Sequence, residues 1–156
     1  MPIVLHRIDD RLIHGQVVVG WGRPLGVGFI ALVDDTVAAS EWEQELYRMG
    51  VPPEMTLYFA DVEAAARQHA LWESDPRPGI VLAADIDTMR RLAALVAIAE
   101  VNVGGIHQAP GRAQRLRYVF LSQDEERSLR ALADTGVRIS AQDVPGSKTV
   151  ELEELL

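Results

Sequence analysis

The chain alternates between short apolar runs and longer stretches in which apolar residues recur every three or four positions. The short runs predict strands at Ile3–Leu5, Phe29–Val33, Thr56–Phe59, Ile80–Ala83, Val101–Val103, Tyr118–Leu121 and Val137–Ser140. The periodic stretches predict amphipathic helices at Ile13–Trp21, Ala38–Met49, Val62–Trp72, Thr88–Ala97 and Asp124–Ala133. Such alternation is typical of an α/β fold. We therefore predict three layers, with a mainly parallel β-sheet flanked by helices on both faces.

Several helix boundaries carry their own signals. Ser122 and Glu125 have the spacing of a capping box, in which each side chain satisfies a backbone donor of the other residue. Asp61 and Asp87 are predicted N-caps, and Gly136 is predicted to end the last long helix. No linker or repeat interrupts the pattern, so residues 1–156 are predicted to form a single domain.

Composition narrows the class of protein. The chain is 48% hydrophobic and 24% charged, as globular proteins are, and its lack of cysteine excludes disulfides and thiolate chemistry. No apolar run is long enough to cross a bilayer and no secretory signal is present, so the cytoplasm is the expected compartment. A net charge of −8 argues against a broad nucleic-acid surface. Lys148 is the only lysine among 15 basic residues, and arginine suits individual phosphate groups.

The densest group of ionisable residues, "HRIDDRLIHGQV" at 6–17, follows the first predicted strand, on the sheet edge where ligands gather. His14 lies where a loop turns into a helix, and Gly15 behind it permits a close backbone approach. A neutral imidazole there could attack a phosphoryl group, and Arg11 could hold the same phosphate with its planar fork. The alternatives are a His14 that packs against the helix and an Arg11 paired with Asp9 or Asp10.

Aspartates on the same edge allow two further interpretations. Asp9 and Asp10 could orient His14 by accepting its second ring proton, or could simply form turns. Asp34 and Asp35, after the second strand, could join them in a pocket for Mg²⁺, or could cap a helix in solvent.

Other histidines offer weaker signals. His107 in "GGIHQAPGR" is in a predicted loop on the active edge, where it could support or dock a substrate, or be merely solvated. His6 and His69 are within predicted elements and are interpreted as structural.

The segment "RIDDRLIHGQV" closely resembles the signature of the mannose-type (mannose/fructose/sorbose) IIB subunits of the bacterial phosphoenolpyruvate-dependent sugar phosphotransferase system. The likeness continues in order through "LVDD", "VNVGGIH", "FLSQDEE" and "AQDVP". The resemblance implies a parallel-rich sheet with the active histidine in the loop after the first strand.

It also implies a phosphotransferase that acts as a phosphocarrier. His14 would accept a phosphoryl group from a IIA protein, through Nδ1, and pass it to a sugar imported by the membrane subunits IIC and IID. Arg11 would support the transfer, and neither a metal nor a cofactor is expected. Substrate-binding or supporting roles are assigned to Asp9, Asp10, Gly15, Gln16, Asp34, His107 and Arg112. The alternative is a non-catalytic signalling or ligand-binding domain with the acidic Mg²⁺ pocket.

An acidic carrier would repel a phosphorylated partner unless basic side chains surround the site. Arg7, Arg11 and Arg112 are therefore predicted to ring it. The sequence names neither the sugar nor the oligomeric state, and a homo-oligomer is compatible with it.

Overall fold

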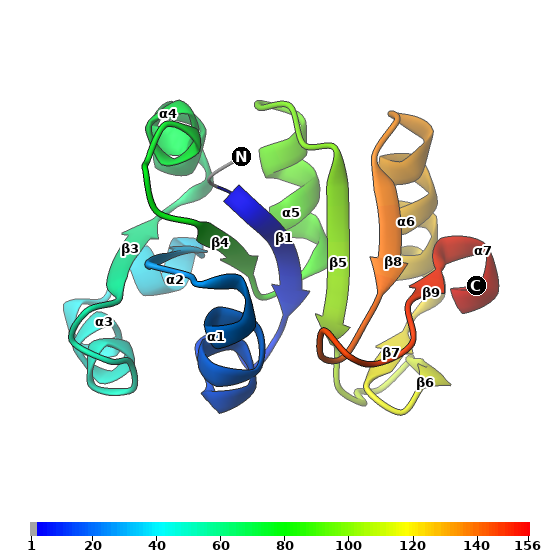
Figure 1. The fold of residues 1–156 in the computed structure, drawn as a ribbon. Coiled ribbons are helices and arrows are strands. Elements are labelled where there is room, and N and C mark those ends of the chain that lie inside the picture. Colours follow the sequence, from blue (N-terminus) through cyan, green and yellow to red (C-terminus); the bar gives the residue numbers. More distant parts are fainter. Residues whose placement is uncertain (1–2) are drawn as a thin grey trace.

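A seven-stranded sheet forms the centre of the protein in the computed structural model, which describes residues 3–156 (Figure 1). Its strand order is β3-β2-β4-β1-β5-β8-β9, and only β9 runs antiparallel to its neighbour. The strands are β1 (Ile3–Asp9), β2 (Phe29–Val33), β3 (Thr56–Ala60), β4 (Gly79–Ala83), β5 (Glu100–Gly105), β8 (Arg138–Ala141) and β9 (Val150–Glu151). The predicted α/β class with a mainly parallel sheet is confirmed.

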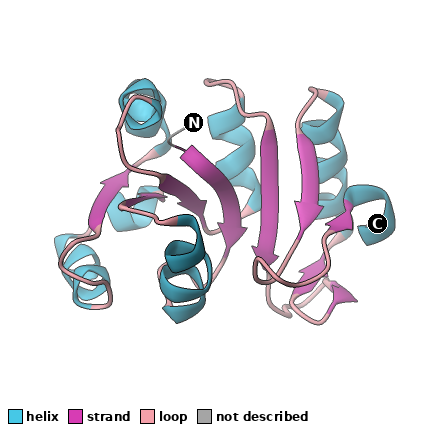
Figure 2. Cartoon of the chain, in the orientation of Figure 1, coloured by secondary structure: helices cyan, strands magenta, loops and turns pink. Residues whose placement is uncertain are grey.

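Helices cover both faces of this sheet (Figure 2). One face carries α4 (Val62–Glu73), α5 (Ile86–Ala93), α6 (Gln123–Asp134) and the short α7 (Leu152–Leu155). The other carries the π-helix η1 (Gln16–Trp21), α1 (Gly22–Leu25), α2 (Asp35–Ala38) and α3 (Glu41–Met49). Each face has its own buried apolar cluster, so the three predicted layers are present. Within residues 3–156, every helix falls short of the length and apolar character that a membrane crossing requires.

The first strand is longer than its apolar run. The strand continues through Arg7 to Asp9. These two charged residues interrupt the hydrophobic pattern, so the pattern does not predict where the strand ends. Both side chains are fully buried, and they tolerate burial because they form an ion pair with each other, 3.2 Å between Nη2 and Oδ2. The motif therefore begins inside the sheet, whereas the hydrophobic pattern predicts a loop from residue 6 onward.

The predicted helix at 38–49 is α3, which begins at Glu41, and a separate short helix, α2, ends at Ala38. Asp34 caps α2 by accepting the Val37 N–H at 2.9 Å, and Ser40 caps α3 by accepting the Glu43 N–H at 3.3 Å. The predicted helix at 13–21 begins only at Gln16, as the π-helix η1, and α1 follows it from Gly22.

One cap prediction is wrong. Asp85, not Asp87, caps α5 by accepting the Thr88 N–H at 2.7 Å. Asp87 lies in the first turn and pairs with Arg90. The Asp61 cap is confirmed.

The capping box of Ser122 and Glu125 is also confirmed, and Gly136 follows α6 in the left-handed conformation, with φ 100°.

The strand predicted at Tyr118–Leu121 does not join the main sheet. As β7 (Val119–Leu121) it pairs antiparallel with β6 (Ala113–Leu116), which the hydrophobic pattern missed because two of its four residues are polar. A single parallel bridge between Ile106 and Val119 links this hairpin to the end of β5. The short β9 was also missed.

Candidate active site

His14 is held by an unusual turn at the carboxyl end of β1. The Leu12 N–H donates to the Asp9 carbonyl at 2.9 Å, and Leu12 adopts φ 58°, a left-handed conformation rare for a side chain other than glycine. The buried Leu12 side chain anchors this turn in the second apolar cluster. The backbone carbonyl oxygen of Leu12 lies 2.7 Å from His14 Nδ1. Because a carbonyl only accepts, the His14 proton is on Nδ1 and the lone pair is on Nε2.

The free nitrogen faces the buried carboxylate of Asp9. His14 Nε2 lies 3.7 Å from Asp9 Oδ2, too far for a hydrogen bond, and no other atom in residues 3–156 bonds to it. The expectation that Asp9 or Asp10 accepts the ring proton is therefore wrong, because Leu12 accepts it. Attack through Nδ1, as the family resemblance implies, requires the ring to release the Leu12 carbonyl.

Asp9 binds two guanidinium groups at once. Arg11 donates Nε to Oδ1 at 2.9 Å and Nη2 to Oδ2 at 2.7 Å, a two-point contact that raises the pKa of Arg11. Arg7 approaches the same carboxylate from below, and burial lowers the pKa of Arg7. The Arg11 side chain stays 43% exposed, and its Nη1 has no hydrogen bond within the described residues. One edge of the Arg11 fork is thus available to a ligand.

Arg7 forms the floor of the site. Its Nη1 donates to Asn102 Oδ1 at 2.5 Å and to the Gln142 carbonyl at 3.0 Å, and its Nη2 donates to the Asp143 carbonyl at 3.1 Å. Its guanidinium also lies over the Trp21 ring, 5.1 Å from the centroid. These contacts engage Nη1 and Nη2 of the buried cation, whereas its Nε has no hydrogen-bond partner in residues 3–156, and they hold Arg7 as a fixed support.

Two glycines of β5 make room for the cluster. A Cβ on Gly104 would lie 1.9 Å from Arg7 Cζ, and one on Gly105 would lie 2.8 Å from Asp9 Oδ1. The "VNVGGIH" pattern therefore has a packing explanation: larger residues would displace the charged groups.

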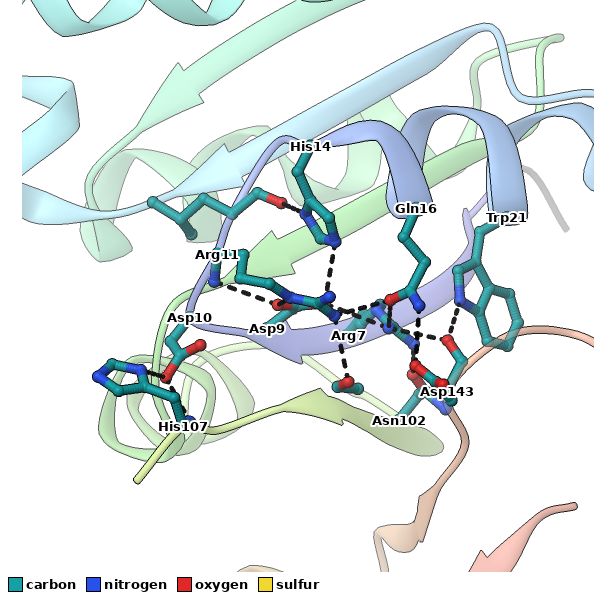
Figure 3. A network of polar contacts seen from close by, with 12 residues as sticks. Arg7, Asp9, Asp10, Arg11, His14, Gln16, Trp21, Asn102, His107 and Asp143 are labelled. Carbon is teal, nitrogen blue, oxygen red and sulfur yellow. Dashed lines mark hydrogen bonds and ion pairs between the residues drawn. The ribbon is translucent and has the colours of Figure 1, made fainter. Parts of the chain in front are cut away.

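Gln16 joins the His14 loop to the loop after β8. Its Oε1 accepts from Arg11 Nη2 at 2.7 Å, and its Nε2 donates to Asp143 Oδ1 at 2.8 Å (Figure 3). Trp21 Nε1 donates to the Asp143 carbonyl at 3.0 Å, and Arg117 pairs with its carboxylate. Sequence reasoning missed Asn102 and Asp143. The position of "AQDVP" after a strand, on the active edge, was the available signal for Asp143.

Asp10 and His107 form a separate pair beside this network (Figure 3). Asp10 accepts the His107 backbone N–H at 2.8 Å and also contacts Nδ1 of the ring, so it ties the loop after β1 to the loop after β5. Arg112 donates from Nε and Nη2 to Glu125, 2.9 Å each, and from Nη1 to the His107 carbonyl. Arg112 therefore braces the His107 loop.

The predicted ring of arginines needs correction. Arg7 is buried and cannot meet a partner, and Arg112 is engaged by Glu125. The exposed arginines at this edge are Arg11 and Arg117.

The acidic Mg²⁺ pocket is not present. Asp34 serves as the cap of α2, and Asp35 pairs with Arg91 at 3.0 Å, while Asp9 and Asp10 bind the partners described above. Within residues 3–156, no three His, Asp or Glu side chains are grouped to hold a metal ion. The alternative binding-domain interpretation loses its main support.

Gly15 precedes η1 directly after His14, and a Cβ there would meet no atom within 4 Å. A cavity of about 730 Å³ has Trp21 and Asn102 among its lining residues, but neither His14 nor Arg11 lines it. A macromolecule could thus approach the His14 loop at an open backbone position.

Comparisons with known proteins agree with this geometry. The family model described as PTS system sorbose subfamily IIB component matches residues 3–156. The chain is 31% identical to the N-acetylgalactosamine-specific phosphotransferase enzyme IIB component 1 of Escherichia coli K12, covering 97% of each protein. It is 29% identical to the mannose-specific EIIAB component of that strain, covering all of this chain and 49% of that protein.

Solved structures give the same result. The IIBSor domain of the sorbose permease from Klebsiella pneumoniae is 29% identical, with a TM-score of 0.89, and the match covers 99% of this chain and 96% of that domain. The protein manxB from Thermoanaerobacter tengcongensis is 32% identical, with a TM-score of 0.86 over 98% of this chain and 93% of that one. The chain belongs to the sorbose subfamily of IIB components of the phosphotransferase system, which are phosphocarriers in sugar transport.

Proposed function

We propose that this IIB component carries its phosphoryl group on His14, between a IIA donor protein and a sugar. The observation that carries the proposal is the free ring nitrogen of His14 beside Arg11, whose fork is fixed on Asp9. Phosphoryl transfer depends mainly on positioning and charge stabilisation, and this group supplies both.

In the accepting step, the lone pair of a neutral His14 nitrogen forms a bond to phosphorus while the donor histidine's nitrogen–phosphorus bond breaks. The donor ring, which carries a proton on its other nitrogen, leaves as neutral imidazole, and the His14 ring keeps its own N–H and becomes a protonated phosphohistidine. Arg11 Nη1 has no other hydrogen bond within the described residues, and it donates to an oxygen of the phosphoryl group during transfer. Asp9, Gln16 and Arg7 act only by holding Arg11 and the loop.

Partners follow from the family. In the mannose-specific EIIAB relative, this chain matches about half of one polypeptide, which supports a IIA unit as the donor here. The acceptor is a sugar at the membrane subunits IIC and IID, and the chain works as a single IIB domain in the cytoplasm, where IIA reaches it. His107, Asp10 and Arg112 support the site by bracing the neighbouring loop.

The test is transfer from radiolabelled phospho-IIA to purified protein. Wild type and His107→Ala should become labelled, and His14→Ala should not. Label retained by His14→Ala, or lost equally in His107→Ala when circular dichroism shows that both are folded, would overturn the assignment.

A further inference from the structure

Helix α3 presents an apolar stripe that this chain does not cover. Trp42, Leu46 and Met49 are four and three positions apart, a spacing that puts them on one side of the helix. They are 72%, 49% and 82% exposed. We refer to these three residues as the α3 stripe.

The inner side of α3 explains why the stripe faces outward. Tyr47, half-buried, packs against the second apolar cluster near Phe59, and α3 has no fully buried residue. Tyr47 is about 140° from Trp42 around a helix with 100° per residue, so the two sides of α3 are distinct. The helix therefore keeps three large apolar side chains in water, where they lower solubility unless a partner covers them.

Acidic residues flank the stripe. Glu41 and Glu45 precede Trp42 and Leu46 by one position and are exposed; Glu45 forms an ion pair with Arg48, whereas Glu41 has no ion-pair partner in residues 3–156. Tryptophan and methionine are enriched at the centres of protein interfaces, and a charged rim sets which partner fits. The α3 stripe therefore fits a partner protein whose surface has an apolar patch surrounded by basic residues.

Three kinds of occupant fit poorly. A lipid surface attracts helices with basic polar sides, whereas this one is acidic. In a symmetric dimer through the stripe, the same glutamates would face each other on two chains of net charge −8. A phosphorylated IIA protein would bring further negative charge.

Membrane proteins, in contrast, concentrate lysine and arginine in their cytoplasmic loops. We propose that the α3 stripe docks on the basic cytoplasmic loops of the transporter's membrane subunits, an inference that rests on the proposed function.

The stripe lies apart from the His14 edge. In Figure 1, α3 is on the flank of the sheet beside the edge strand β3, whereas the His14 loop follows β1 near the centre. Strands β2 and β4 separate β1 from β3, which places the two regions on the order of 15 Å apart across the sheet. The carrier can therefore stay bound to the membrane subunits while the His14 edge meets IIA and the sugar in turn.

The test measures binding to proteoliposomes that contain the IIC and IID subunits of the same transporter. The variant Trp42→Ser/Met49→Ser removes two exposed residues of the stripe. The control Leu71→Ser/Leu95→Ser removes two exposed apolar residues, 71% and 58% exposed, from α4 and from the turn after α5. Because Trp21 and Trp72 are buried, a change in tryptophan emission on binding that the stripe variant lacks reports contact at Trp42 in the wild type.

We expect the Kd of the stripe variant to rise about tenfold or more, as for loss of two central interface residues. The control should stay within about twofold of wild type, and empty vesicles should bind none of the three. Glu41→Lys/Glu45→Lys should also weaken binding, most at low salt.

Wild type that fails to bind, equal affinities in the stripe variant and wild type, or wild-type binding to empty vesicles would overturn the inference. Labelling by phospho-IIA keeps this failure distinct from failure of the proposed function. If all variants are labelled at the wild-type rate but docking is absent, only the stripe proposal is wrong.

Discussion

At Asp9, one buried carboxylate determines the positions of the two arginines that define the site. It fixes Arg7 beneath and Arg11 beside His14, so the positive charge near the ring is in place before any phosphate arrives. In the proposed phosphoryl transfer, such fixed charges would act without reorganisation during the reaction, which is a main way for a protein to lower a reaction barrier. Removing the carboxylate would leave the buried Arg7 without its ion-pair partner.

Residue chemistry made some of this predictable. His14 and Arg11 could be chosen because an imidazole nucleophile and a guanidinium fork are suited to phosphate. The role of the Leu12 carbonyl could not be predicted, because every residue has a backbone carbonyl. Only the turn at Leu12, with φ 58°, directs this carbonyl toward His14. Asn102 is 95 positions from its partner Arg7, and no local pattern predicts that contact.

Replacing Arg11 by lysine tests the fork. Arg11→Lys should retain the fold but slow phosphoryl transfer on the order of 10²-fold, since one ammonium cannot bind Asp9 at two points and still face the ligand. Single-turnover transfer from phospho-IIA and a thermal melt measure both effects. A wild-type rate with a lowered melting temperature would mean that Arg11 is only a structural partner of Asp9.

Among the elements, β1 and α5 show where the sequence pattern failed. Apolar runs locate strands well when their residues are buried without polar partners, as in β2 and β4. In β1 the apolar run ends before the strand does, because the ion-paired Arg7 and Asp9 are buried as completely as an apolar side chain. At α5, two aspartates two positions apart offered the same cap chemistry, and only the extended backbone of Asp85 matches a cap.

The cap of α5 can be measured directly. Asp85→Ala should lower the free energy of unfolding by about 1 kcal/mol, since the Thr88 N–H loses its acceptor. Asp87→Ala removes only an exposed ion pair with Arg90 and should cost less than half as much. Urea denaturation of both variants gives the comparison, and equal losses would contradict the assigned cap.

The His6–His69 pair joins β1 to α4 and makes stability depend on pH. Their Nε2 atoms are 3.1 Å apart, and burial, with a smaller effect of His69, lowers the pKa of His6 to about 4 from 6.5. As the pH falls, His6 therefore binds a proton near pH 6.5 in the unfolded chain but only near pH 4 in the folded chain. The free energy of unfolding should fall as the pH decreases through this window.

His6→Gln isolates that contribution, because glutamine can still donate to His69 but does not titrate. Between pH 6.5 and 4, the wild type should lose about 2 kcal/mol more stability than the variant. Denaturation curves at several pH values give the difference. Parallel pH profiles for the two proteins would show that His6 does not cause the loss.

For the whole molecule, net charge and the placement of exposed arginines govern the encounter with a donor. A chain of net charge −8 must meet a phosphorylated protein, and Arg11 and Arg117 are its exposed basic groups at the active edge. The total charge could be read from the sequence. Which arginines are exposed could not, because pairing with Glu125 or burial in the sheet removes Arg112 and Arg7.

Charge reversal at Arg117 tests this account of docking. Arg117→Glu should slow transfer several-fold at low donor concentration, with a defect that shrinks as ionic strength rises, because rim charges act mainly on association. Arg67→Glu makes the same charge change at an exposed position on α4 and should have little effect. A defect independent of salt would place Arg117 outside the docking face.

The central claim is that His14 holds the phosphoryl group, and the most direct measurement is the site and chemistry of the modification. Wild-type protein incubated with phospho-IIA would be digested at mildly alkaline pH, and the modified peptide sequenced by mass spectrometry. The account predicts one phosphate, labile to acid and stable to alkali, on the peptide that contains His14. An acid-stable phosphate, or one located on His107 or on an aspartate, would contradict it.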